Sequence, residues 1–385
     1  MIHEIALTIK PTMSCNMRCK HCFNGDILNS SEMLELDKVK NFIEAACKKY
    51  KDVKITFHGG EPTLAGIEYY KTVFSFQNEM KIKYGTKFSN NFTTNALLLN
   101  DELMELLIEN NALINISFDG PYNDYLRAYS DIVLDRIMNV KSKGGRTRAF
   151  CTISKGSYEH LKDIYLWFSE RAIDFKILPI EPRGYAAIDK ELLMDIDIFM
   201  KNLTETYRYW LLDKNCDIRF YTFEEFADLR RTTQFKPFWF KREIALNPDG
   251  KIYPFGRPND IQFCLGESDD SLDLEACFSS KEYERMIEIL QAYREQYCKK
   301  CSATMVCNGV CICMSYMYVQ DSQLLEYSCN QSRHIFENIL DINDEVIEDI
   351  RTGNDEKYNE FARNIFMKDI DNYAKSISFK RNQIN

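Results

Sequence analysis

The chain has 385 residues, of which 45% are hydrophobic and 28% are charged, so it can build two or three domains with a normal core. Its net charge of −9 argues against nonspecific binding to nucleic acid, and no segment is long and apolar enough to span a membrane. The start, MIHEIALTIK, lacks a signal-peptide pattern, which predicts a cytoplasmic protein. In that compartment the 14 cysteines indicate metal ligands rather than disulfides.

Strand-like and helix-like segments alternate from the N-terminus to about residue 212. The predicted strands are short, β-branched or aromatic, and flanked by Gly, Asn or Pro: 5–10, 53–57, 87–94, 113–119, 146–154 and 174–180. The predicted helices carry apolar residues on one face: 36–50, 68–83, 101–110, 131–143, 158–171 and 190–212. Such β/α units in series predict an α/β fold with a parallel sheet and right-handed crossovers.

A cysteine-rich loop follows the first predicted strand. The run SCNMRCKHCF places Cys15, Cys19 and Cys22 in the spacing C-x3-C-x2-C, with His21 expected to pack beside them. Three thiolates can hold three irons of a [4Fe-4S] cluster and leave the fourth iron open to a small molecule. Clusters that only carry electrons, like structural zinc, normally have four ligands, so three favour chemistry at the open iron.

A second motif, ITFHGGEPTLAG, follows the second predicted strand. In order and distance, this GGEP motif and the cysteine loop together resemble the radical SAM superfamily. The resemblance implies a partial (β/α)6 TIM barrel, with both motifs at the carboxyl ends of the strands. It also implies that S-adenosylmethionine chelates the open iron through its amino and carboxylate groups. A chance triplet that binds zinc, or nothing, is the alternative.

The same resemblance implies which residues contact the cofactor. Gly59 and Gly60 would let the backbone approach the ligand closely, and Glu61 would accept hydrogen bonds from its ammonium group. Further cofactor contacts are implied for Phe23, Thr94, Asn95, Ser117 and Arg127, and more weakly for Ser154. A polar strand cap is the alternative for Thr94, a surface arginine for Arg127, and a turn former for Asp119.

A second group of cysteines lies between residues 298 and 329 and resembles the SPASM extension of radical SAM enzymes that modify peptides and proteins. The resemblance implies that Cys298, Cys301, Cys307 and Cys329 hold the more distant auxiliary cluster. A zinc site with four cysteine ligands is the alternative. The domains expected from these patterns are a radical SAM barrel over 1–235, a SPASM-like iron–sulfur domain over 236–334, and C-terminal helices over 335–385.

The chain departs from the family at the nearer auxiliary cluster. The phrase GKIYPF puts Phe255 where the family carries a cysteine, and Gly256 where sulfatase maturases carry an acidic base. The candidate substitute ligands for a rearranged cluster are Cys264, Cys277, Cys311 and Cys313. An ordinary buried thiol is the alternative for each of them. We therefore expect one or two auxiliary [4Fe-4S] clusters, reduced odds of formylglycine formation, and no assigned catalytic base.

The resemblance implies a function. A 5′-deoxyadenosyl radical would take a hydrogen atom from a ribosomally made precursor peptide, and a thioether or carbon–carbon cross-link would form. A sulfatase-type protein maturase is the first alternative, and a non-catalytic iron–sulfur or zinc protein is the second. Expected partners are the precursor peptide, a separate leader-binding protein, and an external electron donor such as flavodoxin or ferredoxin, with no nucleic acid and no membrane.

Overall fold

The computed structural model describes residues 4–25, 31–228, 243–254, 256, 261–301, 322–368 and 370. Within these ranges one sheet has the strand order β6-β5-β4-β3-β2-β1-β7-β8-β9. Its strands are β1 (Glu4–Ile9), β2 (Asp52–Phe57), β3 (Lys87–Thr94), β4 (Leu113–Ser117), β5 (Thr147–Ile153), β6 (Phe175–Pro179), β7 (Glu243–Leu246), β8 (Lys251–Pro254) and β9 (Gly266–Glu267). Strands β1 to β6 pair in parallel with their neighbours, which confirms the predicted α/β fold.

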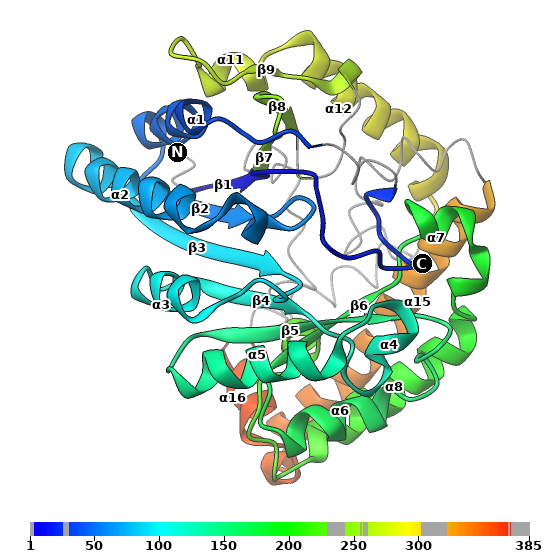
Figure 1. The fold of residues 1–385 in the computed structure, drawn as a ribbon. Helices are drawn as coiled ribbons and strands as arrows, with labels where there is room; N and C mark the ends of the chain where they lie inside the picture. The colour runs from blue at the N-terminus through cyan, green and yellow to red at the C-terminus, as the bar shows by residue number, and fades with distance from the viewer. Residues whose placement is uncertain are drawn as a thin grey trace.

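Helices connect these strands and cover the outer face of the curved sheet (Figure 1). The connecting helices are α1 (Leu36–Lys49), α2 (Ile67–Tyr84), α3 (Asp101–Glu109), α4 (Asn123–Leu126), α5 (Ser130–Ser142), α6 (Leu161–Glu170), α7 (Tyr185–Ile188), α8 (Ile196–Leu212) and α9 (Tyr221–Ala227). Later helices are α11 (Leu274–Phe278), α12 (Lys281–Tyr293), α15 (Ser322–Arg351) and α16 (Glu360–Met367). None of the helices in the described ranges is long and apolar enough to cross a membrane.

The alternation of side chains along β1 shows why these segments become strands of a barrel. Ile5, Leu7 and Ile9 are buried, whereas Ala6 and Thr8 between them are only partly buried. Successive residues of a strand point to opposite faces, so the apolar set packs under the helices and the other set lines the barrel interior. Polar side chains line the same face of other strands, and this leaves the interior polar.

The segment after residue 243 forms the expected hairpin and also extends the barrel. Strands β7 and β8 pair antiparallel, and Gly250 has the left-handed φ of +76° that their turn requires. Strand β7 also pairs in parallel with β1, from Ala6 opposite Glu243 to Ile9 opposite Leu246. The hairpin read from the sequence is therefore also a seventh parallel strand, a pairing between distant segments that local patterns do not reveal.

Three predicted helices differ in extent from the observed ones. The segment 190–212 divides into a 3-10 turn (Lys190–Leu192) and α8, because Asp195 caps α8 by accepting a hydrogen bond from Ile198 N. Helix α6 begins at Leu161 rather than at 158. The C-terminal helix, α15, begins at Ser322 rather than near 335 and continues past 334 without a break. The domain limits at 235 and 334 stay predictions.

The free edge of β6 is covered by the segment that leads into α9. Phe175 N donates a hydrogen bond to Arg219 O at 3.1 Å, and Phe220 forms a parallel bridge with Phe175. Further along, the Thr222 hydroxyl accepts a bond from Ile177 N at 3.0 Å and donates one to Ile177 O at 3.1 Å. These contacts satisfy backbone groups that an open sheet edge would expose for pairing with another chain.

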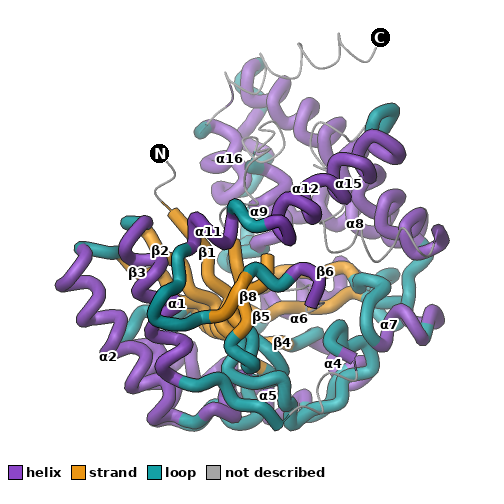
Figure 2. The backbone as a smooth tube through the Cα atoms, turned by 90° about the horizontal axis from the view of Figure 1, so that it is seen from above, coloured by secondary structure: helices purple, strands orange, loops and turns teal. Residues whose placement is uncertain are grey.

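A buried asparagine joins the C-terminal helices to the barrel. Helix α15 packs against α8, and both lie on one side of the molecule with α16 (Figure 2). The Tyr207 hydroxyl of α8 donates to Asn343 Oδ1 at 2.8 Å, and Asn343 Nδ2 donates to Phe226 O at 2.8 Å. Asn343 and Tyr207 are fully buried, so this polar contact fixes how the three helices meet.

We predict that Asn343→Ala lowers the free energy of unfolding by about 1–3 kcal/mol, because it removes both buried hydrogen bonds by which the amide joins Tyr207 to Phe226 O. Urea unfolding measures the change. Asn338→Ala is the matched control, since Asn338 lies on the same helix but is exposed and bonds only to His334 O. That variant should differ from the parent by less than about 0.5 kcal/mol. Equal losses in the two variants would refute the bridging role of Asn343.

Candidate functional site

The cysteine loop, residues 10–25, lies beyond the carboxyl ends of the first strands, beside α4 and α7 (Figure 1). It contains no long helix or strand, so neighbouring loops must hold it in place. Glu61 N donates to Ser14 O at 2.8 Å, and Gly60 N donates to Thr12 O at 3.0 Å. Lys20 N donates to Leu126 O of α4 at 2.9 Å. The loop is thus tied by its backbone to the loops after β2 and β4.

The two glycines of the GGEP motif make this contact possible. A Cβ on Gly60 would lie 2.1 Å from Ser14 O and 2.4 Å from Met13 O. A Cβ on Gly59, whose φ is +122°, would lie 2.4 Å from Thr12 O. We expected these glycines to admit the cofactor, but the observed close approach is to the backbone of the cysteine loop. The motif is therefore a packing surface for that loop.

A third glycine, which the sequence analysis missed, serves the far end of the same loop. Gly184 follows β6 with a φ of +54°, and a Cβ there would lie 2.2 Å from Cys22 O. Its neighbour Tyr185 donates from its backbone N to Cys22 O at 3.1 Å. The sequence signal was a lone glycine after the sixth predicted strand, which carries little information without knowledge of what lies opposite it.

Glu61 is buried and organises the loops rather than pointing into open space. Its Oε1 accepts bonds from Thr63 N, the Thr63 hydroxyl and the Thr94 hydroxyl, and its Oε2 accepts one from Asn95 N at 2.7 Å. The Thr94 hydroxyl also accepts a bond from Ala96 N at 2.9 Å. This geometry matches the strand-cap interpretation of Thr94, and it gives Glu61 a structural task beside any contact with a ligand.

Asn95 connects the end of β3 to the first cysteine. Its Nδ2 donates to Asn16 Oδ1 at 2.8 Å and lies 3.8 Å from Cys15 Sγ. Its Oδ1 accepts a bond from Leu97 N at 3.1 Å. The structure therefore brings Asn95 into the candidate site, next to a thiol rather than in an open groove.

Arg127 and Asp119 form a buried pair beside the second cysteine. Arg127 Nε donates to Asp119 Oδ2 at 2.9 Å, and its Nη2 donates to the Thr152 hydroxyl at 3.0 Å. Arg127 Nη1 lies 3.9 Å from Cys19 Sγ. Asp119 Oδ1 accepts a bond from Thr152 N at 2.7 Å, and Asp119 is 1% exposed. The surface-arginine interpretation of Arg127 is therefore wrong. Asp119 does open a 3-10 turn, in which Tyr122 N donates to Asp119 O at 3.3 Å, and its carboxylate also positions Arg127.

The three thiols are half-buried and close enough to influence one another. Burial raises the pKa of Cys15 to about 11, and the charges of Glu61, Cys19 and Cys22 add to this effect. Burial also raises the pKa of Cys19, and the nearby positive charge of Arg127 opposes this rise. Thiols in such a place need a metal to become thiolates at neutral pH, because metal binding releases their protons.

The chemistry of the three donors fits a cluster. Cys15, Cys19 and Cys22 lie on one loop, within electrostatic reach of one another. Three such thiolates can each bind a different iron of a cubane and leave the fourth iron open. Among the described residues, no three or more His, Cys, Asp or Glu side chains stand close enough to share one metal ion.

Two buried polar atoms near the loop also point to a bound group. Ser154 Oγ, just past the end of β5, and His21 Nδ1 have no hydrogen-bond partner among the described residues. Buried polar atoms are rarely left so, which indicates that something supplies their partners. Phe23 meets the ring of His58 edge-to-face at 5.8 Å, and Ser117 ends β4 half-buried. These residues surround the same end of the barrel.

Residues 9–168 match the model of the Radical SAM superfamily. The chain carries a radical SAM domain. A [4Fe-4S] cluster and S-adenosylmethionine are the cofactors that this family implies, and the donor set described above fits them. The matched range covers both motifs, strands β2 to β5 and the last residue of β1.

Curated relatives of this radical SAM enzyme include sulfatase maturases. The cysteine-type anaerobic sulfatase-maturating enzyme of Clostridium perfringens is 25% identical over 364 residues, which cover 86% of this chain and 95% of that protein. The serine-type enzyme of Bacteroides thetaiotaomicron is 28% identical over 181 residues, 42% of each chain.

Solved structures support the same fold. The enzyme anSMEcpe with bound AdoMet superposes with a TM-score of 0.73 at 21% identity, covering 89% of this chain and 98% of that one. Streptococcus suis SuiB bound to S-adenosylmethionine superposes with a TM-score of 0.60 at 19% identity, covering 83% and 75% of the two chains. At these identities the likeness confirms the partial barrel.

The structure gathers three cysteines of the SPASM-like group. Cys298 ends a π-helix (Arg294–Cys298), Cys301 N donates to Cys298 O at 3.0 Å, and Cys329 lies in α15. Burial and the charges of Cys329 and Cys301 raise the pKa of Cys298. The Tyr293 hydroxyl lies 3.3 Å from Cys329 Sγ. Cys307, Cys311 and Cys313 lie outside the described residues.

The region of the nearer auxiliary cluster shows two thiols beside one glycine. Cys264 Sγ lies 3.4 Å from Gly266 O, and Cys277 Sγ would be 4.0 Å from a Cβ on Gly266. Burial raises the pKa of Cys277 to about 11, with Cys264 among the smaller causes. Phe255 lies outside the described residues. A Cβ on Gly256 would be 3.3 Å from Thr8 Cγ2, so this position faces β1.

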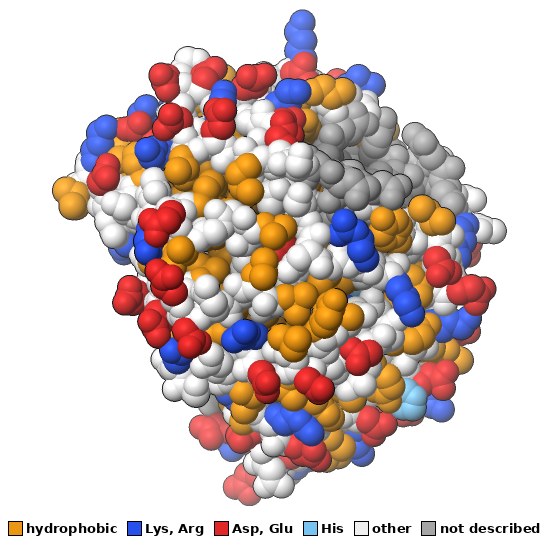
Figure 3. Space-filling model, viewed as in Figure 1, with side chains coloured by type: hydrophobic (Ala, Val, Ile, Leu, Met, Phe, Trp, Pro, Cys, Tyr) orange, Lys and Arg blue, Asp and Glu red, His pale blue; other side chains and the backbone are white. Residues whose placement is uncertain are grey.

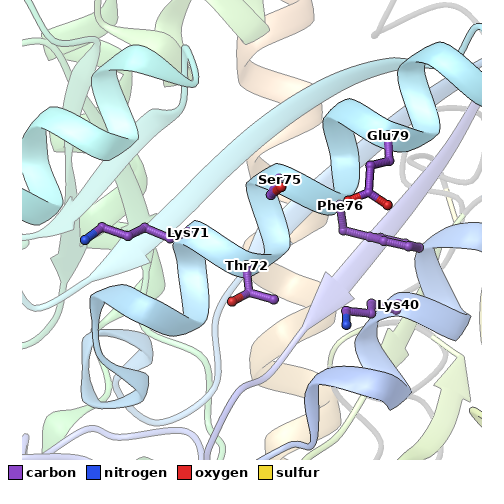
Figure 4. Close-up of a pocket in the computed structure, with 6 residues that line it drawn as sticks. All are labelled: Lys40, Lys71, Thr72, Ser75, Phe76 and Glu79. Atoms are coloured by element: carbon purple, nitrogen blue, oxygen red, sulfur yellow. The ribbon is translucent and has the colours of Figure 1, made fainter.

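A surface pocket of about 450 Å³ lies away from this site, between α1 and α2 (Figure 4). It is lined by Lys40, Lys71, Thr72, Ser75, Phe76 and Glu79. None of these is a predicted cofactor residue, and both helices lie on the outside of the barrel, so the pocket has no part in the radical chemistry.

We predict that Gly60→Ala reduces cluster loading, because its Cβ would overlap the backbone of residues 13 and 14 and displace the cysteine loop. Overpacking of this kind costs about 1–3 kcal/mol of stability. Iron content after anaerobic reconstitution and thermal unfolding measure both effects. Gly85→Ala is the control for iron content, since Gly85 caps α2 and no atom lies within 4 Å of its added Cβ. Its φ of +67° makes alanine costly for stability, but the iron content should stay that of the parent. Full iron content in Gly60→Ala would contradict this account.

We predict that Asp119→Asn lowers the free energy of unfolding by about 3–5 kcal/mol, because it leaves the buried charge of Arg127 without its counter-charge. Urea unfolding of the protein before reconstitution measures it. The exposed pair Arg208–Glu345 provides the control, since Glu345→Gln removes a comparable 2.5 Å contact in solvent. In Glu345→Gln the free energy of unfolding should change by less than about 1 kcal/mol. A similar small change in Asp119→Asn would show that the buried pair is not ionised.

Proposed function

We propose that this radical SAM enzyme is a peptide maturase that installs a thioether or carbon–carbon cross-link in a ribosomally made precursor peptide. The observation that carries this choice is Gly256. The resemblance to sulfatase maturases implies an acidic base at this position, and here the position has no side chain and faces Thr8 of β1. A cross-linking enzyme that uses a different proton acceptor has no need of that residue.

In this proposal Cys15, Cys19 and Cys22 hold the [4Fe-4S] cluster, and S-adenosylmethionine occupies its open iron. The bound group supplies a 5′-deoxyadenosyl radical that takes a hydrogen atom from an unactivated carbon. The chain holds the cysteine loop rigidly through Gly59, Gly60 and Gly184. The Asp119–Arg127 pair keeps a cation beside Cys19, where it stabilises negative charge on the sulfur.

Polar side chains of β3, β4 and β5 bond to one another across the sheet, and the mouth beside the cysteine loop is the place that we propose for a substrate. Arg148 Nε donates to Asn115 Oδ1 at 2.7 Å, and Asn115 Nδ2 donates to the Thr93 hydroxyl at 3.3 Å. Lys176 Nζ lies 2.8 Å from both carboxylate oxygens of Glu225. A peptide held at the mouth would exclude water from the radical, which is a requirement of such chemistry.

Cys298, Cys301, Cys307 and Cys329 are proposed to hold an auxiliary [4Fe-4S] cluster. The approach of the first two and Cys329 from separate elements supports this assignment. Four thiolates close a cluster against ligands, so it would accept the electron that remains after bond formation. Whether Cys264, Cys277, Cys311 and Cys313 form a rearranged second auxiliary cluster stays a prediction, as does the cytoplasmic location.

Maturation of a sulfatase is the second candidate, favoured by the extent of the match to the Clostridium perfringens enzyme. The two candidates differ in the fate of sulfur. A cross-link to cysteine removes two hydrogens and keeps the sulfur, whereas formylglycine formation from cysteine removes the sulfur. High-resolution mass spectrometry of a treated peptide therefore distinguishes them.

We predict that the reconstituted, reduced enzyme cleaves S-adenosylmethionine to methionine and 5′-deoxyadenosine, and that a Cys15→Ala, Cys19→Ala, Cys22→Ala variant does not. Given a short peptide encoded beside its gene, the parent should yield a product lighter by two hydrogens. A sulfatase-derived peptide is the control substrate and should stay unchanged. Loss of sulfur from that control peptide would overturn the cross-linking proposal in favour of the maturase.

The number of clusters follows from iron counting on the same samples. Two cubanes bind about eight irons per chain, and a rearranged third would raise this to about twelve. The triple variant should hold about four fewer in either case. If both the parent and the variant bind zinc instead of iron, the result would favour the alternative of a non-catalytic zinc protein.

A further inference from the structure

The cysteine loop presents two basic side chains to solvent directly beside the cluster ligands. Arg18 and Lys20 flank Cys19 in sequence, and both are exposed. No carboxylate among the described residues lies within ion-pair distance of either one; Arg18 Nη1 instead donates to the loop carbonyls of Cys15 and Met17. In a chain with a net charge of −9, uncompensated cations at this position need an explanation.

Aromatic side chains extend this basic surface over α4. Lys20 Nζ lies 5.6 Å from the centre of the Tyr125 ring, and Tyr125 is 40% exposed. Tyr129, at the start of α5, is 53% exposed and has a left-handed φ of +63°, a strained conformation for a bulky residue. Exposed tyrosines next to arginine and lysine are typical of protein-binding surfaces.

Nearby acidic groups do not cancel this charge. Lys155, whose pKa is influenced by Tyr125, is paired with Glu191 at 2.7 Å and adds no net charge. Asp124 on α4 accepts a bond from the Ser130 hydroxyl at 2.6 Å, away from the loop cations. Figure 3 shows acidic and basic side chains scattered over the visible face, with apolar side chains among them. Arg18 and Lys20 thus form a small cationic patch with an aromatic border.

We propose that Arg18, Lys20, Tyr125 and Tyr129 form the docking surface for the electron donor, a small one-electron carrier protein with an acidic surface. The cluster must receive one electron before each reaction, and electron transfer slows steeply with distance. A carrier seated on this patch is one residue away from Cys19. Opposite charges steer such an encounter and fix its orientation. This inference rests on the proposed cluster at the three cysteines.

The proposed step is the transfer of one electron. The reduced carrier loses this electron and is oxidised, and the oxidised cluster gains it and is reduced. No proton or chemical group needs to move between the proteins. The patch therefore has to provide only proximity and orientation.

The test compares two ways of reducing the reconstituted holoenzyme: reduced flavodoxin, an acidic carrier, and photoreduced deazaflavin, a small molecule that needs no docking surface. Rates of cluster reduction and of S-adenosylmethionine cleavage are measured for the parent and for Lys20→Glu; Arg18 is kept because its side chain bonds to the loop carbonyls of Cys15 and Met17. We expect the variant to lose about tenfold or more in rate with flavodoxin at low salt, and nothing with deazaflavin. Raising the salt should slow the parent but not the variant.

The matched control is Lys87→Glu, which reverses one exposed charge at the opposite end of the barrel and should behave as the parent does. Tyr129→Gly, which suits the left-handed backbone, should raise the flavodoxin concentration needed for half-maximal rate without lowering iron content. Equal losses with both reductants, or no loss with flavodoxin, would overturn the docking surface. Failure of the parent with deazaflavin would instead overturn the proposed radical chemistry.

Discussion

The structure depends on holding an irregular loop in one conformation without burying it in a helix or strand. The cysteine loop must place three thiolates on separate irons while one iron stays open. Its backbone is fixed by direct contact with the loops after β2 and β6, at distances that only glycine permits at Gly60 and Gly184. The barrel supplies the rigid strand ends from which these loops project. The fold therefore serves chiefly to hold the two glycine-bearing loops against the cysteine loop.

Electrostatics divides the loop into an inner and an outer side. On the inner side, Arg127 is held by buried Asp119 beside Cys19, where a cation stabilises negative charge on a sulfur ligand. On the outer side, Arg18 and Lys20 face solvent. The loop thus has a fixed cation from a neighbouring element on its inner side and two exposed cations of its own on its outer side. Deeper in the barrel, Lys176 and Glu225 neutralise each other.

Much of this arrangement was predictable from the sequence. The features that were not predictable all join segments that lie far apart in the sequence. Strand β3 was predicted to the residue, and the spacing of the cysteines indicated the cluster, because periodicity and local spacing are properties of contiguous residues. The parallel pairing of β7 with β1, the contact of Gly184 with Cys22, and the burial of Asp119 against Arg127 join distant segments. Single-sequence reasoning offered a turn former as one interpretation of Asp119, and the 3-10 turn that it opens bears this out, but the ion pair with Arg127 could not be seen.

The central claim is that Cys15, Cys19 and Cys22 hold a cluster whose open iron binds S-adenosylmethionine. Electron–nuclear double resonance of the reduced cluster tests this most directly, using S-adenosylmethionine isotopically labelled at its amino nitrogen and carboxylate oxygens. The account predicts that both labels couple to the electron spin of the cluster, and that the coupling is absent in the triple alanine variant. A cluster signal that ignores both labels, or one that persists unchanged without the three cysteines, would contradict it.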